Sequence, residues 1–465
     1  MSDTEDVKFS LSVLVNKQRT KVLYAEIDSD FADILLSFLT LPLGTIVRIL
    51  GKHYGDESPV VGSLTNLYQS LSNLNSDLFC TESCKQMLLN PRKSIRNELC
   101  KLKLNVDDTR MTKYFKCPDK DCRCKRTPNL GLYYDTSKCD CGNFALNYDM
   151  GDLEVTSGVY TKSTTSFLIS DDLQIVPSET EYAIRILTGL GITVTNSTVL
   201  MDVTFGFNQV MDLLKGSLDS LLSESPLTDI ILNKGLLSSI AVKREKCILP
   251  VDQAVEQSSF NNKKITVKAI MQKSINRLLF VEADGNFVDF LFSLFTIPLG
   301  KIECLLGGST GFKNIDNLYR SLGNITDDKY LNTQDTKTML LEPEIPNGYV
   351  SKDQILPLIE ETLNYFMEGA LVSFKSPKGP ENYVKGQKMY MVTDDLTVSP
   401  LCMASSISIF NQLKVPLYDV KELKLDIGPK EALGILKASL TSNSALTDGL
   451  MIKPTPMKQP KQERA

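Results

Sequence analysis

The sequence predicts an α+β protein made of two tandem homologous domains. Residues 8–51 and 264–307 align without a gap, and 16 of the 44 aligned residues are identical. Four shorter blocks then recur in the same order: residues 66–71 as 317–322, 87–91 as 339–343, 170–173 as 393–396, and 214–218 as 436–440. Two long copies indicate two similar globular halves, because open solenoids usually need three or more short repeats.

Length and composition fit that class. A chain of 465 residues exceeds one comfortable core and suits two or more domains. The net charge of −5 gives no overall basic field to hold nucleic acid or an anionic membrane. The N-terminus lacks an apolar signal core, and the longest uncharged apolar run, 34–47, is too short to span a bilayer. We therefore expect a soluble intracellular protein of the cytoplasm or nucleus, not secreted and with no membrane partner.

Each copy begins with a predicted β-hairpin followed by a helix. Residues 265–271 and 278–283 are apolar and β-branched, with a polar turn between them. Asp28 and Asp284 can cap the next helix by accepting bonds from its unpaired amides. Phe31, Ile34, Leu35, Phe38 and Leu39 then form one apolar stripe at helical spacing.

Proline and glycine are predicted to end that helix in both copies. Pro42 and Pro298 offer no amide hydrogen, and Gly44 and Gly300 give the chain freedom to change direction.

Later elements also recur. The Asn-Leu-Tyr blocks predict a second helix, and residues 167–176 and 389–399 predict hairpins with paired aspartates at the turn. Residues 213–222 and 433–440 predict late helices. The predicted division is a first repeat domain at 1–250, a linker at 251–263, a second repeat domain at 264–450 and a disordered tail at 451–465.

The first copy contains a cysteine-rich insertion, at about residues 115–145, that the second copy lacks. Between the shared Tyr-Phe pair and the shared Asp-Asp-Leu, the first copy is longer by about 28 residues. Five of the eleven cysteines fall there, as Cys117-x4-Cys122-x-Cys124 and Cys139-x-Cys141. Thiolates at both ends of a short excursion can close a tetrahedral Zn²⁺ site and hold a loop that has no core of its own.

This pattern predicts a zinc-ribbon-like loop. We assign Cys117, Cys122, Cys139 and Cys141 as ligands, with Cys124 as the alternate, because Cys122 and Cys124 are too close for both to be needed. An unmetallated reduced loop or an oxidised cysteine pair is the alternative. Four thiolates leave no open coordination position, so the predicted zinc is structural.

Other groups that resemble catalytic or binding motifs have simpler interpretations. The paired aspartates, 171/172 and 394/395, fit turns better than an acid–base dyad. Glu26 and Glu282 recur at strand-to-helix junctions, where a shared acidic site is one interpretation. The single histidine, His53, is expected at the surface. The glycines at 189–191 and 307–311 lack the rest of a nucleotide-binding motif.

The motifs also support a family resemblance. LYAEIDSDFAD at 23–33, FLTLPLGTI at 38–46, NLYQSL at 66–71, the Asp-Asp-Leu…Pro of 171–177 and the Cys-x-Cys-Gly of 139–142 resemble the plant family of unknown function DUF674. The resemblance implies a tandem, two-copy architecture and a plant origin. It implies no activity and no catalytic residue.

Three hypotheses for function follow. The first is a non-catalytic interaction or scaffold protein with protein partners and a structural zinc loop, because no motif supplies a nucleophile, a base or a cofactor cradle. The alternative is a nucleic-acid-associated zinc-loop protein, since Lys and Arg surround the cysteines. The third is an enzyme of unrecognised type with a site between the two halves, lined by acids such as Glu26 and Glu282.

Overall fold

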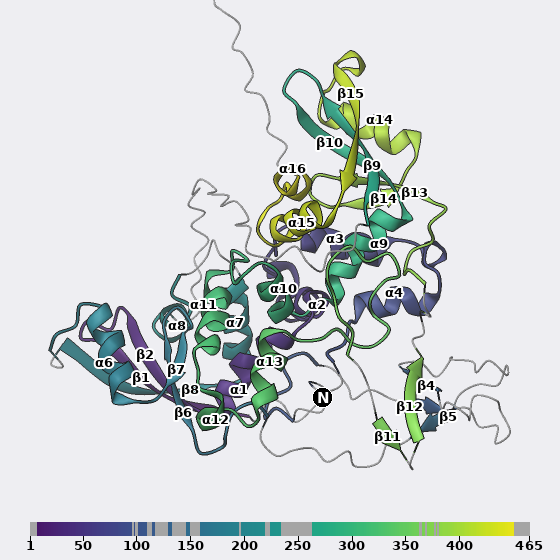
Figure 1. The fold of residues 1–465 in the computed structure, drawn as a ribbon. Helices are drawn as coiled ribbons and strands as arrows, with labels where there is room; N and C mark the ends of the chain where they lie inside the picture. The colour runs from purple at the N-terminus through teal and green to yellow at the C-terminus, as the bar shows by residue number, and fades with distance from the viewer. Residues whose placement is uncertain are drawn as a thin grey trace, which may run out of the picture.

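The computed structural model confirms the α+β class. It describes residues 7–94, 97, 101–108, 114–116, 129–132, 146–148, 159–194, 197–218, 224–233, 263–361, 365–367, 370–375, 378 and 381–450. These residues form two five-stranded antiparallel sheets, a third small sheet and the helices between them (Figure 1). Among them, no helix combines the length and the apolar character needed to cross a bilayer.

The two large sheets have the same strand order. The first has the order β7-β6-β2-β1-β8, formed by β1 (Phe9–Asn16), β2 (Val22–Asp28), β6 (Ser166–Ser170), β7 (Ile175–Pro177) and β8 (Thr198–Phe205). The second has the order β14-β13-β10-β9-β15, formed by β9 (Ile265–Gln272), β10 (Arg277–Asp284), β13 (Met389–Thr393), β14 (Val398–Pro400) and β15 (Val420–Ile427). The duplication in the sequence is therefore a duplication of sheet topology.

Most helices also correspond in pairs, and α12 (Asp327–Tyr330) of the second repeat takes the place of a 3-10 turn, Ser76–Leu78, of the first. The first repeat has α1 (Ser29–Ser37), α2 (Leu43–Tyr54), α3 (Leu64–Asn73), α4 (Glu82–Leu89), α6 (Thr180–Gly189), α7 (Phe207–Leu218) and α8 (Pro226–Ile231). The second has α9 (Gly285–Ser293), α10 (Leu299–Leu305), α11 (Lys313–Gly323), α12 (Asp327–Tyr330), α13 (Gln334–Leu341), α14 (Met403–Gln412), α15 (Pro429–Thr441) and α16 (Ala445–Gly449). In Figure 1 the two sheets lie at opposite ends of a central helical layer.

The predicted hairpins and helix caps are confirmed. Alternate residues of β1 point into the core, as the period of a half-buried strand requires. Asp28 accepts a hydrogen bond from the amide of Phe31 at 2.9 Å, and Asp284 accepts one from the amide of Phe287 at 3.3 Å. Each aspartate thus satisfies an amide in the first turn of the helix that follows β2 or β10.

The role assigned to the glycines is wrong. Both prolines lie at the start of a second helix, α2 or α10, and both glycines lie inside its first turn. A Cβ at Gly44 would lie 2.9 Å from the Cβ of Phe295, and one at Gly300 would lie 2.4 Å from the carbonyl oxygen of Leu340. The glycines are required by close packing between segments and not by a change of chain direction.

The two repeats cross at this point. Leu43 N donates to the Ile297 carbonyl at 3.1 Å, and Leu299 N donates to the Leu41 carbonyl at 2.9 Å. The equivalence of these two bonds indicates an approximate twofold relation between the repeats. One continuous buried cluster contains core residues of both.

Each sheet is completed by helices of the other repeat. Helix α3 packs against α9 and β14, and α11 packs against α7 and β7. Val398 N donates to the hydroxyl of Ser70 at 2.9 Å, and Ile175 N donates to the hydroxyl of Ser321 at 3.0 Å. The repeats are therefore joined by reciprocal exchange of their middle helices.

A third sheet, of order β11-β12-β4-β3-β5, lies where the first repeat has its insertion. Its strands are β3 (Tyr114–Lys116), β4 (Asn129–Leu132), β5 (Leu146–Tyr148), β11 (Tyr365–Met367) and β12 (Ala370–Lys375). Strand β12 pairs in parallel with β4, so this sheet also contains strands of both repeats. The predicted linker at 251–263, apart from residue 263, and the tail at 451–465 lie outside the described residues, and the domain limits stay a prediction.

Candidate functional site

The predicted zinc ligands cannot be placed. Cys117, Cys122, Cys124, Cys139 and Cys141 all lie outside the described residues, so the zinc-ribbon-like loop stays a prediction. Within the part of the chain that is described, no group of three or more His, Cys, Asp or Glu side chains could hold a metal ion. The candidate site of this structure lies elsewhere, at the turn that carries the first pair of aspartates.

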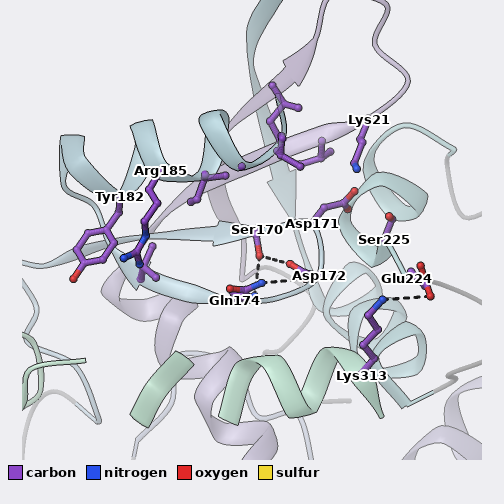
Figure 2. Close-up of a pocket in the computed structure, with 16 residues that line it drawn as sticks. Lys21, Ser170, Asp171, Asp172, Gln174, Tyr182, Arg185, Glu224, Ser225 and Lys313 are labelled. Carbon is purple, nitrogen blue, oxygen red and sulfur yellow. Dashed lines mark hydrogen bonds and ion pairs between the residues drawn. The ribbon is translucent and has the colours of Figure 1, made fainter. Parts of the chain in front are cut away.

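A pocket of about 430 Å³ lies beneath α6 in the first repeat (Figure 2). This volume is within the usual range for a small ligand or an inserted side chain. Its walls come from β2, the β6–β7 turn, α6, the segment before α8, and α11 of the second repeat. It is lined by Lys21, Val22, Leu23, Ser170, Asp171, Asp172, Gln174, Val176, Tyr182, Arg185, Ile186, Gly189, Leu190, Glu224, Ser225 and Lys313.

Asp171 lines this pocket and is hydrogen-bonded to α8. Its carboxylate accepts bonds from the amide of Thr228 at 2.8 Å and from the Thr228 hydroxyl at 2.7 Å. In the second repeat, Asp394 accepts the same two bonds from Thr447, at 2.8 and 2.9 Å. Burial raises the pKa of both aspartates, and the bonds from the threonines act in the opposite direction. Each carboxylate thus caps the N-terminus of a helix that is distant in sequence from its own turn.

Asp172 joins the same turn to the other repeat. Its carboxylate accepts hydrogen bonds from two side-chain amides, that of Gln174 at 3.1 Å and that of Asn317 at 3.0 Å. The equivalent Asp395 accepts a bond from Asn66 at 3.2 Å. The hairpin turns were predicted correctly. However, the aspartates also bond to helices outside their own turns. The first aspartate of each pair bonds to α8 or α16, and the second bonds to the exchanged helix α11 or α3.

Cations lie at the rim of the pocket. Lys21, Arg185 and Lys313 are all exposed, and Lys313 Nζ pairs with Glu224 at 3.3 Å. The guanidinium of Arg185 lies 5.0 Å from the ring centre of Tyr182. Burial raises the pKa of Asp171, and the charge of Lys21 opposes that rise only in small part. Figure 2 shows Tyr182 and Arg185 at one end of the pocket and Lys21 near Asp171 at the other.

Comparison of the repeats separates what is architectural from what is particular to this pocket. The positions of Tyr182 and Arg185 on α6 correspond to Ser405 and Ser408 on α14. Lys313 corresponds to Gly62, at the start of the exchanged helix. The aspartates recur in both repeats, whereas the aromatic ring and two of the three cations occur only in the first.

Packing beneath the two helices also differs. In the second repeat, Phe410 of α14 contacts Phe280 of β10 with ring centres 5.8 Å apart. Phe280 belongs to a separate buried cluster with Ile270, Leu279 and Met391, and Phe410 packs against that cluster. The first repeat has Leu187 and Tyr24 at the corresponding positions. A smaller leucine and a more polar tyrosine thus replace the two phenylalanines between the helix and the sheet of the first repeat.

The other predicted groups serve the fold separately. Glu26 accepts a bond from the Ser178 hydroxyl at 2.7 Å, while Glu282 pairs with Lys268 at 2.9 Å on the other sheet. His53 is half-buried rather than at the surface, and its ring lies 5.6 Å from that of Phe207. In the glycine-rich segment 307–311, Thr310 donates its amide to Asp316 at 3.0 Å.

Sequence reasoning missed Tyr182, Arg185 and Lys313. The signal was present, since a residue-by-residue comparison of α6 with α14 reveals the differences. Lys313 could not be assigned to this pocket from the sequence, because it reaches the site only through the exchange of α11.

The fold defines a two-repeat α+β protein, and the pocket described above lies in its first repeat. The chain belongs to the family described as "Protein of unknown function (DUF674)", whose sequence model matches residues 5–423 and 375–464. The overlapping second match agrees with a repeated unit. No curated protein and no solved structure matches the chain.

Proposed function

We propose that this protein is a non-catalytic interaction protein whose pocket beneath α6 receives an acidic group of a protein partner. One observation carries the proposal: the two aspartates of the pocket are bonded to the fold, while its cations lie at an exposed rim. Asp171 and Asp172 are engaged by Thr228, Gln174 and Asn317, as are their counterparts in the second repeat. Carboxylates used in this way support architecture rather than acid–base catalysis.

The rim has the chemistry to bind an acidic side chain. Among the described residues, neither Lys21 nor Arg185 forms an ion pair. Both side chains can therefore bind a carboxylate of another molecule. Arg185 presents a planar fork that fits a carboxylate with two hydrogen bonds. Tyr182 and the aliphatic side chains of Ile186 and Leu190 provide apolar contact for the rest of the partner segment.

A charge-reversal experiment tests this proposal. The wild-type protein and the double variant Lys21→Glu/Arg185→Glu would be used as baits in extract from cells that express the protein, and bound proteins quantified by mass spectrometry. The matched control reverses Arg277 and adds an acid at Ser408, the equivalent positions of the second repeat. We expect a salt-sensitive set of partners retained by the wild type and by the control but lost from the first-repeat variant. The same set on all three baits would contradict the proposal.

The same proposal includes the structural zinc loop of the first repeat. Strand β3 ends at Lys116, directly before Cys117, and Lys116 pairs with Leu146 of β5. This pairing brings the chain on the two sides of the cysteine segment together, which supports coordination by Cys117, Cys122, Cys139 and Cys141. Because four thiolates fill the coordination shell, the expected stoichiometry is one Zn²⁺ per chain.

Metal analysis of the purified full-length protein tests the zinc proposal. We expect Cys117→Ser to lose most of the zinc, and Cys402→Ser, at an exposed cysteine of the second repeat, to keep it. Wild-type protein that carries no zinc after purification without chelators would refute the assignment.

An intracellular location is also part of the proposal. Cys80, Cys84, Cys304 and Cys402, all among the described residues, are free thiols. Free thiols fit a reducing compartment. The plant origin implied by the resemblance belongs to the same proposal. Imaging of a fluorescent fusion in plant cells would test the location, and accumulation outside the cell would contradict it.

A further inference from the structure

Two carboxyl groups lie buried beside each other where α11 begins in the second repeat. Glu303 of α10 is 0% exposed, and Asp316 in the first turn of α11 is 7% exposed. The glycine-rich segment 307–311 lies between the two helices. Thr310 of that segment contacts both acids, since its hydroxyl oxygen lies 2.6 Å from Asp316 Oδ1 and 3.0 Å from Glu303 Oε1. The three side chains form one buried group, and none of them lines the pocket beneath α6.

The hydrogen atoms of this group do not suffice for two ionised carboxylates. The hydroxyl of Thr310 has one hydrogen, so it donates to one acid at a time. The shorter contact and the bond from the Thr310 amide, at 3.0 Å, both favour Asp316 as the ionised acceptor. Glu303 then faces the lone pairs of the hydroxyl oxygen unless it carries a proton of its own, and no hydrogen-bond donor among the described residues reaches its buried Oε2. A proton on Glu303 satisfies the group, and its loss creates a second buried negative charge.

Arg320 of α11 is a cation beside this pair. Its charge favours the ionised form of Glu303, and its Nε donates to the Asp316 carbonyl at 3.1 Å. Tyr319 of the same helix also lies near Glu303, but burial raises the pKa of that phenol and keeps it neutral. One arginine offsets one carboxylate, so the charges balance when one of the two acids is protonated.

The other ionisable groups of the helices that meet here are paired, neutral or exposed. In α10, α11 and α13 they are Lys301, Cys304, Lys313, Asp335 and Lys337. Lys301 Nζ pairs with Glu342 at 2.7 Å, and Lys313 Nζ pairs with Glu224 at 3.3 Å. Burial raises the pKa of Cys304, so it stays a neutral thiol. Asp335 is exposed, and Lys337 Nζ donates to the carbonyl of Ile325 at 2.9 Å. The short helix η1 (Phe38–Thr40), which also packs against α10, contains no ionisable group.

The equivalent turn of the first repeat is built without these charges. The second repeat has charged residues at three positions where the first has neutral ones, namely Glu303 for Val47, Asp316 for Thr65 and Arg320 for Gln69. The Thr65 hydroxyl accepts a bond from the amide of Val61 at 3.0 Å, as Asp316 does from the amide of Thr310. The fold can therefore make this turn with neutral groups, and the acid pair with its arginine is particular to the second repeat.

We propose that Glu303 is a proton-operated switch, which keeps the turn before α11 closed while it is protonated and opens it on ionisation. Ionised Glu303 would lie against Asp316 in a buried site, where like charges repel more strongly than in water. The segment between them includes Gly307, Gly308 and Gly311, all at positive φ and without side chains to hold one conformation. Because α11 is exchanged into the first repeat, the switch connects protonation in one repeat to the position of Lys313 beside the other.

The direction of the response follows from the site. Burial raises the pKa of Glu303 well above its usual value, and the charge of Asp316 and a hydrogen bond to it raise the pKa further, while Thr310 and Arg320 act in the opposite direction. In an opened, hydrated turn this glutamate returns to its ordinary pKa and releases the proton. The closed turn is therefore favoured at low pH and lost as pH rises. Since opening releases one proton, the open fraction should grow by up to about tenfold for each pH unit between the two pKa values.

Hydrogen exchange followed by mass spectrometry on the full chain tests the switch. The amides of Thr310 and Asp316 report the turn before α11, because they donate to Asp316 Oδ1 and to the Phe312 carbonyl. The amide of Val61 reports the equivalent turn before α3. After correction for the intrinsic pH dependence of exchange, the rate at the α11 turn should rise at least about tenfold more than the rate at the α3 turn from about pH 5 to about pH 7. A change in global stability affects both turns, so their comparison isolates the local response.

Two variants identify Glu303 as the group that titrates. Glu303→Gln keeps the size of the side chain and cannot ionise. Glu303→Val/Asp316→Thr copies the first repeat, and it serves if circular dichroism shows that the buried amide of the first variant disturbs the fold. In both, the α11 turn should respond to pH as the α3 turn does, whereas Asp335→Asn, at an exposed acid of α13, should keep the wild-type response.

Either of two results would overturn the proposal. The first is an equal pH response of the two turns in the wild type, which needs no variant to be folded. The second is a response of the α11 turn that persists without Glu303, since another group would then be titrating.

Discussion

Replacing Asp289 by asparagine is expected to change how the stability of the protein depends on pH. Asp289 lies in α9 and is 2% exposed. Its carboxylate accepts bonds from the amides of Tyr383 at 2.6 Å and Val384 at 3.0 Å. Burial raises the pKa of Asp289 to about 6, because the charged form loses its hydration, while the backbone bonds and the charge of Lys378 act in the opposite direction.

The sign follows from proton binding. Between about pH 4 and pH 6, Asp289 in the folded protein holds its proton while the same residue in the unfolded chain releases it. The free energy of unfolding therefore falls as pH rises through this window. A shift from 3.8 to about 6 is about 2 units, and each unit corresponds to about 1.4 kcal/mol, so the loss from this group approaches about 3 kcal/mol.

Asparagine cannot ionise and so lacks this dependence. From pH 4 to pH 7 the wild type should lose up to about 3 kcal/mol of unfolding free energy that Asp289→Asn does not lose. The difference between the variant and the wild type should therefore rise by that amount. Urea unfolding followed by circular dichroism at several pH values measures this difference.

Two further variants make the test specific. Asp33→Asn should behave in the same way, because Asp33 is the equivalent residue of α1 and burial raises its pKa to about 6 also. Asp56→Asn, at an exposed aspartate, is the matched control for the substitution itself. Parallel profiles of the wild type and Asp289→Asn between pH 4 and pH 7 would refute the reasoning.

Two predictions concern the contacts between the repeats. Gly62→Ala should lower the free energy of unfolding, measured by urea titration, by about 2–4 kcal/mol. Gly62 has φ +46, and a Cβ there would lie 2.4 Å from the carbonyl oxygen of Ser439. The control Gly55→Ala, at φ +56 in open space, should lower it by only about 1–2 kcal/mol. Asn317→Ala should cost about 1–2 kcal/mol by removing its bonds to Asp172, and equal unfolding midpoints for this variant and the wild type would show that the link adds no stability.

The sequence was sufficient for features with a local cause. The hairpins follow from short apolar strands separated by a polar turn, and the caps at Asp28 and Asp284 follow from a carboxylate directly before an apolar helical stripe. The helices at the Asn-Leu-Tyr blocks, α3 and α11, were also predicted. Each of these depends on residues that are neighbours in the chain.

Predictions that depended on distant partners were less successful. Gly44 was interpreted as freedom for the backbone, whereas its neighbour is Phe295 of the other repeat. Asp171 was interpreted as a turn residue, whereas its carboxylate binds Thr228 of α8. In both cases the residue type was noticed, but its partner was invisible because nothing in the local sequence encodes a contact across the fold.

By itself, the sequence determined that this protein is a duplicated α+β unit and which elements each copy contains, because duplication and periodicity are written along the chain. Only the tertiary structure decided that the copies exchange α3 and α11 and that Lys313 of one repeat reaches the pocket of the other. These arrangements are selected by burying apolar surface between segments far apart in sequence, and that choice is made only when the whole chain packs.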